Sequence, residues 1–242
     1  MPLRNLPRVW LGQPLPGYRE GATPFATYTG YQLDQLPAVD LSGNDEFAWL
    51  LAEPVVKGHA SLAVVDASAT RPATQGNLEL LMADTGVVLP ASFSAFINSE
   101  DPRKRVRSCT DCYLDLADFA VPVSDGGYLI HFLSDSQWVA HWLLYVGPDQ
   151  AEAVVATWDP LGFNTVQDEP PVRLFVPGTS DAWVCADSFS EFLFRFWIEN
   201  EVWFKLVHPS DELPLSDQQR RYLKRLGPLR QPTNPTSSDG PD

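Results

Sequence analysis

Three apolar runs joined by short polar segments constrain the fold of this chain more than any other feature. The stretch GGYLIHFLSDSQWVAHWLLYVGPDQAEAVVATWDP holds runs at 128–133, 138–146 and 153–158, separated by the turn-forming segments SDSQ and GPDQAE. Loops this short join antiparallel strands, because parallel strands need a long crossover connection. Near-continuous apolarity indicates that both faces of the sheet are covered, with helices on at least one side. The stretch therefore predicts an antiparallel meander.

Helical patterns flank this meander. In SFSEFLFRFWIENEVWF (188–204), Ser188 and Glu191 have the spacing of a capping box. Apolar residues then recur at helical spacing and form one broad stripe, comprising Phe189, Phe192, Leu193, Phe196 and Trp197. The more polar side of this helix carries Arg195, Glu199 and Glu201. Further helices are predicted at 77–84, at 89–99 and, behind a second capping box of Ser216 and Gln219, at 216–226. The expected fold class is α+β, with a central, mainly antiparallel sheet flanked by helices.

Changes in composition mark the two ends of the chain. Residues 1–42 carry six prolines without sustained periodicity, which predicts an irregular arm, and the aromatic residues of this arm favour docking over free disorder. Residues 43–226 are expected to form a single domain. The polar, proline-rich segment 227–242 predicts a disordered tail.

Charge and cysteine content limit the class of partner and the compartment. A net charge of −14 argues against a nucleic-acid binder, which needs a basic face, and suits a basic protein partner instead. Three cysteines are too few for a disulfide scaffold, so we expect a reducing cytoplasm. The longest apolar runs are too short to span a bilayer, so no membrane insertion is expected. The sequence contains no phosphate-binding loop and no dinucleotide fingerprint, so it predicts no cofactor.

The segment CTDC (109–112) is the one stretch with the form of a chemical site. Cys109 and Cys112 could hold zinc, exchange thiols for disulfides or supply a nucleophile. Zinc needs two further ligands, but Cys185 is isolated and the four histidines show no metal-binding spacing. A redox site needs its first cysteine at a helix N-terminus, and no predicted strand leads into the segment to place it there. A thiol protease of the papain type would need a glycine that is missing here. The pattern favours two packed residues in a loop, and a thiol- or zinc-dependent enzyme stays as the alternative.

Two histidines lie on neighbouring strands of the predicted meander. Whether His131 and His141 meet depends on the parity of the loop between their strands, because successive side chains point to opposite faces. An even loop such as 134–137 fits the apolar runs better and places the two rings on opposite faces. We therefore expect two separate, partly buried histidines.

Three segments together resemble a known family. They are LPASFSAFI (89–97), the strand block 126–146 and the helix SFSEFLFRFWIENEVWF. In this order they are similar to the SUKH superfamily, which includes fungal regulators of cell-wall synthesis, the Syd protein and many bacterial immunity proteins. The resemblance covers about residues 77–205. It implies an α+β domain without a catalytic constellation that acts by binding proteins, often toxins of neighbouring cells.

The expected contact surface consists of acidic turns and aromatic residues at the ends of the strands. We predict that Asp135, Trp138 and Asp149 contribute to this surface. The first hypothesis is thus an immunity protein that neutralises a toxin by direct binding, and a basic toxin would suit the acidic chain. A scaffold or regulatory protein that recruits a partner through its proline-rich arm is a further alternative.

Overall fold

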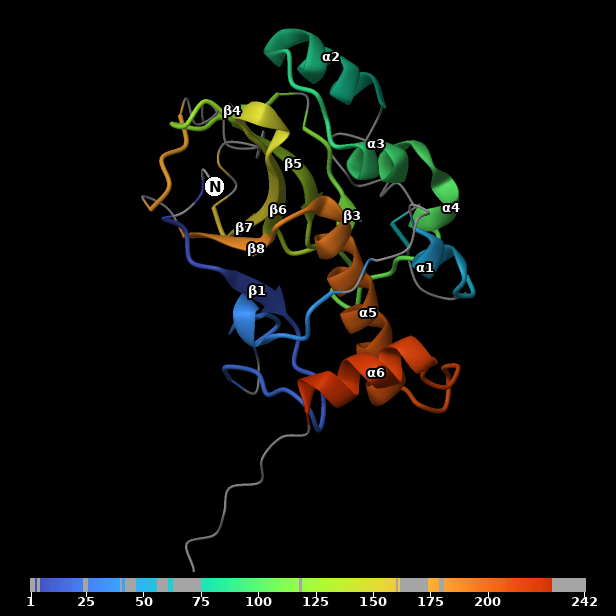
Figure 1. The fold of residues 1–242 in the computed structure, drawn as a ribbon. Coiled ribbons are helices and arrows are strands. Elements are labelled where there is room, and N and C mark those ends of the chain that lie inside the picture. The colour runs from blue at the N-terminus through green and yellow to red at the C-terminus, as the bar shows by residue number, and fades with distance from the viewer. Residues whose placement is uncertain are drawn as a thin grey trace, which may run out of the picture.

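A six-stranded antiparallel sheet forms the centre of the chain (Figure 1). The computed structural model describes residues 3, 5–23, 26–39, 41, 47–55, 61–62, 75–117, 119–159, 161, 174–178 and 181–227. The strands of this main sheet are β3 (Tyr113–Leu114), β4 (Val121–Pro122), β5 (Tyr128–Ser134), β6 (His141–Val146), β7 (Glu152–Thr157) and β8 (Ala182–Ala186). They pair in the order β3-β5-β6-β7-β8, and β4 pairs with β5 on the same edge as β3. The predicted meander is β5, β6 and β7.

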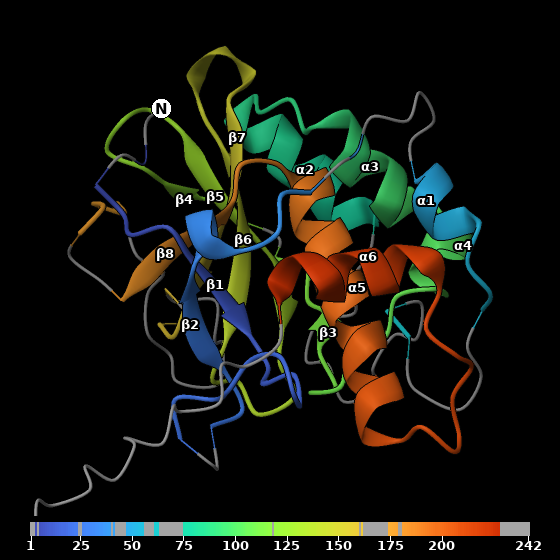
Figure 2. The same ribbon diagram turned by 60° about the horizontal axis from the view of Figure 1, so that its bottom comes forward.

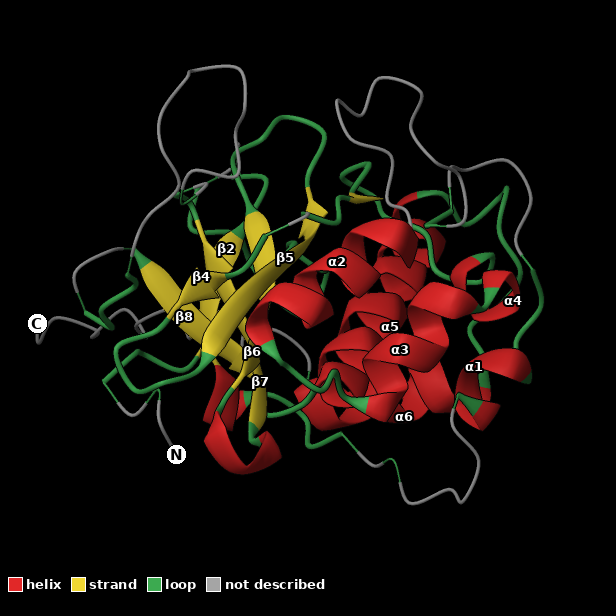
Figure 3. Ribbon diagram, turned by 90° about the horizontal axis from the view of Figure 1, so that it is seen from above, coloured by secondary structure: helices red, strands yellow, loops and turns green. Residues whose placement is uncertain are grey.

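The two faces of the main sheet are covered differently. Figure 3 shows the helices gathered on one side of the strands. That face buries Ile130, Trp142 and Leu144 in the larger hydrophobic core. The opposite face buries a smaller cluster that includes Leu143, Tyr145 and residues of the loops. Alternation along β6 thus sends successive side chains into two separate cores, as expected for a strand that is apolar throughout.

The long helix α5 (Phe189–Val207) and the helix α3 (Ala91–Asn98) pack on the first face. The whole predicted apolar stripe of α5 is buried. Phe93 of α3 makes edge-to-face contacts with Phe132 of β5 and Phe189 of α5, with ring centroids 5.7 and 5.0 Å apart. Ser188 caps α5 by accepting a hydrogen bond from the backbone N–H of Glu191, whereas the Glu191 carboxylate accepts from the backbone N–H of Asp187.

Four further helices lie in the described part of the chain: α1 (Ala48–Leu51), α2 (Gln75–Thr85), α4 (Glu100–Arg103) and α6 (Asp217–Leu226). The capping box predicted for α6 is confirmed, since Ser216 and Gln219 satisfy each other's backbone N–H groups. None of the helices in the described segments is both long and apolar enough to cross a membrane.

The N-terminal arm contributes a small sheet of its own. It is formed by β1 (Val9–Gly12) and β2 (Thr29–Gln32), which are followed by a single 3-10 turn, η1 (Leu33–Gln35). Figure 2 shows this pair of strands beside β8, and the backbone of Arg8 forms an isolated parallel β-bridge with Val184 of β8. Trp10 and Leu11 are buried in the larger core. The arm is therefore packed into the same interior as the helices.

The α+β class with a mainly antiparallel sheet is confirmed. The charged segment 100–107 is partly helical and partly buried, because 100–103 form α4 and Arg107 is buried. Nearly all of the predicted tail at 227–242 lies outside the described residues.

Candidate functional site

The CTDC segment forms a turn between α4 and β3 that is attached to α5. The backbone N–H of Cys109 donates to Oδ1 of Asn200 at 2.7 Å. Cys112 is buried, and its sulfur lies 3.3 Å from Oγ1 of Thr110 and 3.5 Å from the Tyr28 hydroxyl. The segment thus lies in contact with α5 on one side and with the N-terminal arm on the other.

This environment disfavours thiolate chemistry. Burial raises the pKa of the Cys109 thiol well above its ordinary value, and it also raises the pKa of Cys112. A strand, β3, follows the pair, so no helix N-terminus lowers either pKa. Within the described segments, no group of three or more histidine, cysteine, aspartate or glutamate side chains is placed to hold a metal ion.

The two histidines share one face of the sheet, so the prediction that they point to opposite faces is wrong. Ser134 pairs with His141, as an even loop requires, but a β-bulge between His131 and Leu133 shifts the register of the preceding residues. His131 therefore pairs with Leu143, on the same face as His141, and the two ring centroids are 5.4 Å apart. The bulge also turns Phe132 and Leu133 into the same core.

Ser134 joins these histidines in a buried polar cluster. Its Oγ lies 2.9 Å from Nε2 of His131 and 3.0 Å from Nδ1 of His141, and it donates to Oδ2 of Asp115 at 3.1 Å. A hydroxyl has one proton, so both imidazole nitrogens must donate to this oxygen. Burial, and secondarily His141, lowers the pKa of His131 to about 3, while burial lowers that of His141 to about 4. Both rings are thus neutral at pH 7.

The cluster is closed to substrates. Ser134 is fully buried, and His131 and His141 are each 1% exposed. A serine nucleophile needs a base and also a path for the substrate to its oxygen. Here the cluster places three of its side chains in hydrogen bonds to Ser134 inside the sheet, and burial of the Ser134 oxygen leaves no such path.

The three residues expected at the contact surface do not lie together. Asp135 is 1% exposed, and its Oδ1 accepts hydrogen bonds from the backbone N–H groups of Val139 and Ala140, which shapes the β5–β6 turn. Trp138 is half-buried in this turn, where its indole N–H donates to the Tyr113 hydroxyl. Asp149 is exposed in the β6–β7 loop, at the opposite end of β6.

A shallow apolar groove of about 430 Å³ lies beside Trp138. Its lining comes from three segments that are distant in sequence: Thr27 and Tyr28 of the arm, Trp138 and Val139 of the β5–β6 turn, and Trp158 after β7. Val139 and Trp158 are 45% and 38% exposed. A concave apolar surface with exposed aromatic residues is typical of a binding site.

Three aspartates are linked to this groove by sequence or by backbone hydrogen bonds. Asp159 follows Trp158 directly, and the backbone carbonyl of Asp181 accepts a hydrogen bond from the Trp158 N–H. On another side, Asp111 follows Thr110, whose carbonyl accepts from Ser136 in the β5–β6 turn. These three aspartates are exposed.

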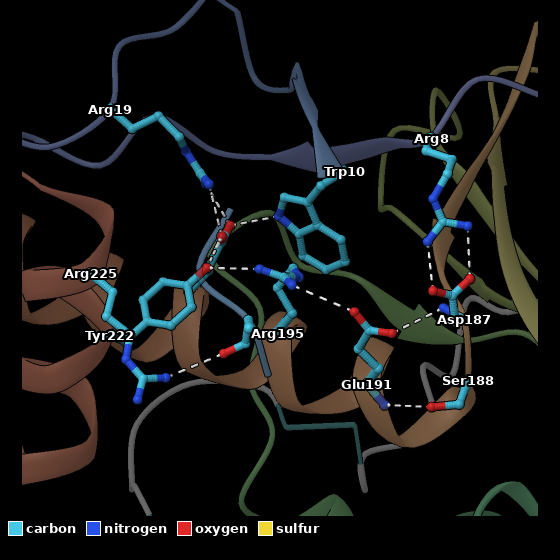
Figure 4. Close-up of polar contacts among 11 residues, drawn as sticks. Arg8, Trp10, Arg19, Asp187, Ser188, Glu191, Arg195, Tyr222 and Arg225 are labelled. Carbon is cyan, nitrogen blue, oxygen red and sulfur yellow. Dashed lines mark hydrogen bonds and ion pairs between the residues drawn. The ribbon is translucent and has the colours of Figure 1, made fainter. Parts of the chain in front are cut away.

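A buried network on α5 fixes the arm that carries Tyr28. The Glu199 carboxylate accepts hydrogen bonds from the Trp10 indole at 2.7 Å, from Arg19 at 2.5 and 2.8 Å, and from the Tyr222 hydroxyl at 2.6 Å. Figure 4 shows Arg19, Trp10 and Tyr222 converging on this point. Burial alone would raise the pKa of Glu199, but Arg19 and these hydrogen bonds hold it below its ordinary value.

The polar side predicted for α5 is thus covered by other parts of the chain. Besides Glu199, the carboxylate of Glu201 binds the guanidinium of Arg107 at 2.7 and 3.1 Å, and Arg107 also binds Glu212 at 2.8 and 2.9 Å. Each of these residues is at most 7% exposed at its side chain. They hold segments together and leave little charge for a ligand.

A second, smaller hollow of about 200 Å³ lies between the segment after α1 and α5. Its lining includes Glu53, Lys205 and the two carboxylates that bind Arg107. Because those carboxylates already have a cationic partner, this hollow is a weaker candidate than the aromatic groove.

Sequence reasoning found Trp138 but missed Tyr28, Val139 and Trp158 as parts of one surface. The aromatic residues at strand ends were a signal, since Trp158 directly follows an apolar run. Nothing in the local sequence, however, brings residue 28 to residue 158.

Comparison with known proteins does not identify a relative: no family model, no curated protein and no solved structure matches this chain. The fold class therefore rests on the structure alone, and membership of the SUKH superfamily stays a prediction.

Proposed function

We propose that this chain is a non-enzymatic protein-binding domain and that the aromatic groove is its contact surface. The observation that carries the proposal is the gathering of Tyr28, Trp138, Val139 and Trp158 in one concave, partly exposed surface. Tryptophan and tyrosine are the residues that most often anchor protein interfaces, because they bury a large area at a low entropic cost.

The chemical groups that could support catalysis lie in unfavourable places. Cys112 and the Ser134 cluster are buried, and the pKa of the Cys109 thiol is raised. None of these groups lines the groove. This placement supports a binding role over the thiol- or zinc-dependent alternative.

A basic protein suits this surface best. The chain has a net charge of −14, and the exposed Asp159 directly follows Trp158 of the groove. Opposite charges raise the rate of association and disfavour acidic competitors. Together with the SUKH resemblance, this supports an immunity protein that neutralises a basic toxin in the cytoplasm by direct binding.

The test is a rescue experiment with two matched variants. The protein encoded by the adjacent gene is expressed in a heterologous host, alone and together with this chain. We expect growth arrest when it is expressed alone, and rescue together with co-purification when this chain is present. A neighbouring product that is harmless, or one that binds this chain without being neutralised, contradicts the toxin proposal.

The matched variants locate the contact. Val139→Arg places a cation in the groove, and Val176→Arg makes the same change at the far end of β5 on a valine of similar exposure, 40% against 45%. We expect the first variant to abolish rescue and the second to preserve it. Equal rescue by both variants contradicts the groove as the contact surface.

A further inference from the structure

The rings of the aromatic groove are held in fixed positions by their neighbours. Tyr28 contacts Trp142 edge-to-face at 5.8 Å and lies 6.2 Å from Trp158, measured between ring centroids. Trp158 also packs edge-to-face on Trp183 at 5.3 Å. Such a surface is preorganised, so little side-chain entropy is lost when a ligand binds.

Trp138 is positioned in the same way. Its ring packs edge-to-face on His141 at 5.3 Å, and its N–H is bound by Tyr113. Asp135 shapes the turn that carries it. Three aromatic rings from three segments thus meet at one groove with their orientation set by contacts behind them.

The electrostatic field of the groove favours a cation. Aromatic faces attract cations, and tryptophan does so most strongly. None of the described residues that line the groove is charged. The exposed Asp159 directly follows Trp158, and the exposed Asp111 directly follows Thr110, whose hydroxyl accepts a hydrogen bond from Tyr28. His141 behind Trp138 is neutral at pH 7, since its pKa is lowered to about 4, so it does not repel a cation.

Among cationic side chains, arginine fits best. Its guanidinium is planar and weakly hydrated, so it stacks on rings more readily than the ammonium group of lysine. Its aliphatic stem can lie on Val139, which is 45% exposed. The chain uses this kind of contact internally, where Arg19 stacks over Tyr31 at 4.0 Å from the ring centroid.

We propose that the aromatic groove binds an arginine side chain presented by a basic protein partner, with the guanidinium stacked on the tryptophan rings and the neighbouring carboxylates facing it. This inference rests on the proposed function and names the anchor residue of the partner.

The test uses short synthetic peptides, so it does not depend on the identity of the partner. The probe is acetyl-Gly-Arg-Gly-Arg-Gly-amide, compared with the same peptide carrying citrulline, the neutral isostere of arginine, or lysine. Binding to the full chain is followed by NMR through the indole N–H signals, which number eight and are assigned by single substitutions. We expect saturable shifts at Trp138 and Trp158.

The expected preference for arginine over citrulline is about 2- to 30-fold in Kd, the range of a cation–π contact between exposed and desolvated sites. Lysine should bind more weakly than arginine. Trp158→Leu should remove this preference while keeping an apolar lining. Asp111→Asn should weaken binding, whereas Asp149→Asn, at another aspartate with positive φ but at the far end of β6, should not.

Equal binding of the arginine and citrulline peptides overturns the inference, as do unchanged signals of both Trp138 and Trp158. Equal binding of the lysine peptide overturns the preference for arginine. The two proposals fail separately. If the peptides show no preference but Val139→Arg abolishes rescue, the groove binds the partner through other chemistry. If the arginine peptide binds as expected but rescue fails, the groove stands and the toxin proposal is wrong.

Discussion

Two arginines of the N-terminal arm offer a direct test of how the arm is held. Arg8 and Arg19 each make two hydrogen bonds to one carboxylate, Arg8 to Asp187 and Arg19 to Glu199. The pair of Arg8 is exposed, at 44% and 41% of the side chains, whereas the pair of Arg19 is buried, at 7% and 1%. Replacing each arginine by alanine compares the same contact in water and in the interior.

The expected costs differ several-fold. Arg19→Ala leaves the Glu199 carboxylate buried without its principal counter-charge, and removing one partner of a buried pair costs about 3–5 kcal/mol. Exposed ion pairs contribute about 0–1 kcal/mol, so Arg8→Ala should change little. For a chain of this size, 1 kcal/mol corresponds to about 2–4 °C in Tm, so Arg19→Ala should lower Tm by about 6–20 °C.

Urea unfolding at pH 7, followed by circular dichroism, measures both variants. Val139 and the other groove residues stay unchanged, so any effect of Arg19→Ala on peptide binding would come through the arm that carries Tyr28. A loss below about 1 kcal/mol for Arg19→Ala, or equal losses for the two variants, would refute the reasoning that burial makes the Arg19 contact indispensable.

Three further predictions follow from burial. The pKa of His131 is lowered to about 3 and that of His141 to about 4, whereas both titrate near 6.5 in the unfolded chain. The unfolded state therefore binds more protons below pH 6.5, and the free energy of unfolding should fall as pH falls from 6.5 to 5, by up to about 1.4 kcal/mol per pH unit for each histidine. Burial raises the pKa of Cys109 and Cys112, so an aromatic disulfide reagent at pH 8 should label the native chain slowly and all three cysteines quickly in urea. Phe93, which is fully buried against two other rings, should cost about 3–5 kcal/mol when replaced by alanine.

Each of these predictions has its control. His131→Gln should reduce the pH slope of stability, and a flat slope in the unsubstituted chain would contradict the reasoning. Rapid labelling of a native thiol would instead favour the redox alternative. Leu80→Ala removes a side chain that is 63% exposed, so it should cost far less than Phe93→Ala; equal costs would show that Phe93 is not in a packed core.

The elements of the fold were predictable where the signal is local. The meander followed from apolar run lengths and short polar loops, and α5 and α6 followed from capping residues and helical spacing. These patterns depend on neighbours within a few residues, which is why the structure reproduces them closely. The bulge at Phe132 was not predictable in this way, because one extra residue leaves the apolar pattern intact while reversing the face of His131.

The candidate site was predictable only in part. Trp138 could be found because it is an aromatic residue at the end of a predicted strand, directly after the polar segment SDSQ. Asp135 has the same local setting, yet its carboxylate is buried and binds its own turn. The two cases differ in which backbone groups and loops surround the side chain, and the sequence does not record this.

The sequence by itself determined the kind of elements, their order and the acidic, cysteine-poor character of the chain. The type of each element follows from the spacing of apolar residues within a few positions, and the net charge follows from composition alone. Tertiary structure alone decided which polar groups lie in water. Glu199 is buried because Arg19, 180 positions earlier, and Tyr222 come to meet it, and the groove exists because Tyr28 lies beside Trp158. Solvation of a side chain depends on whichever segments cover it, and those segments are brought together only when the whole chain folds.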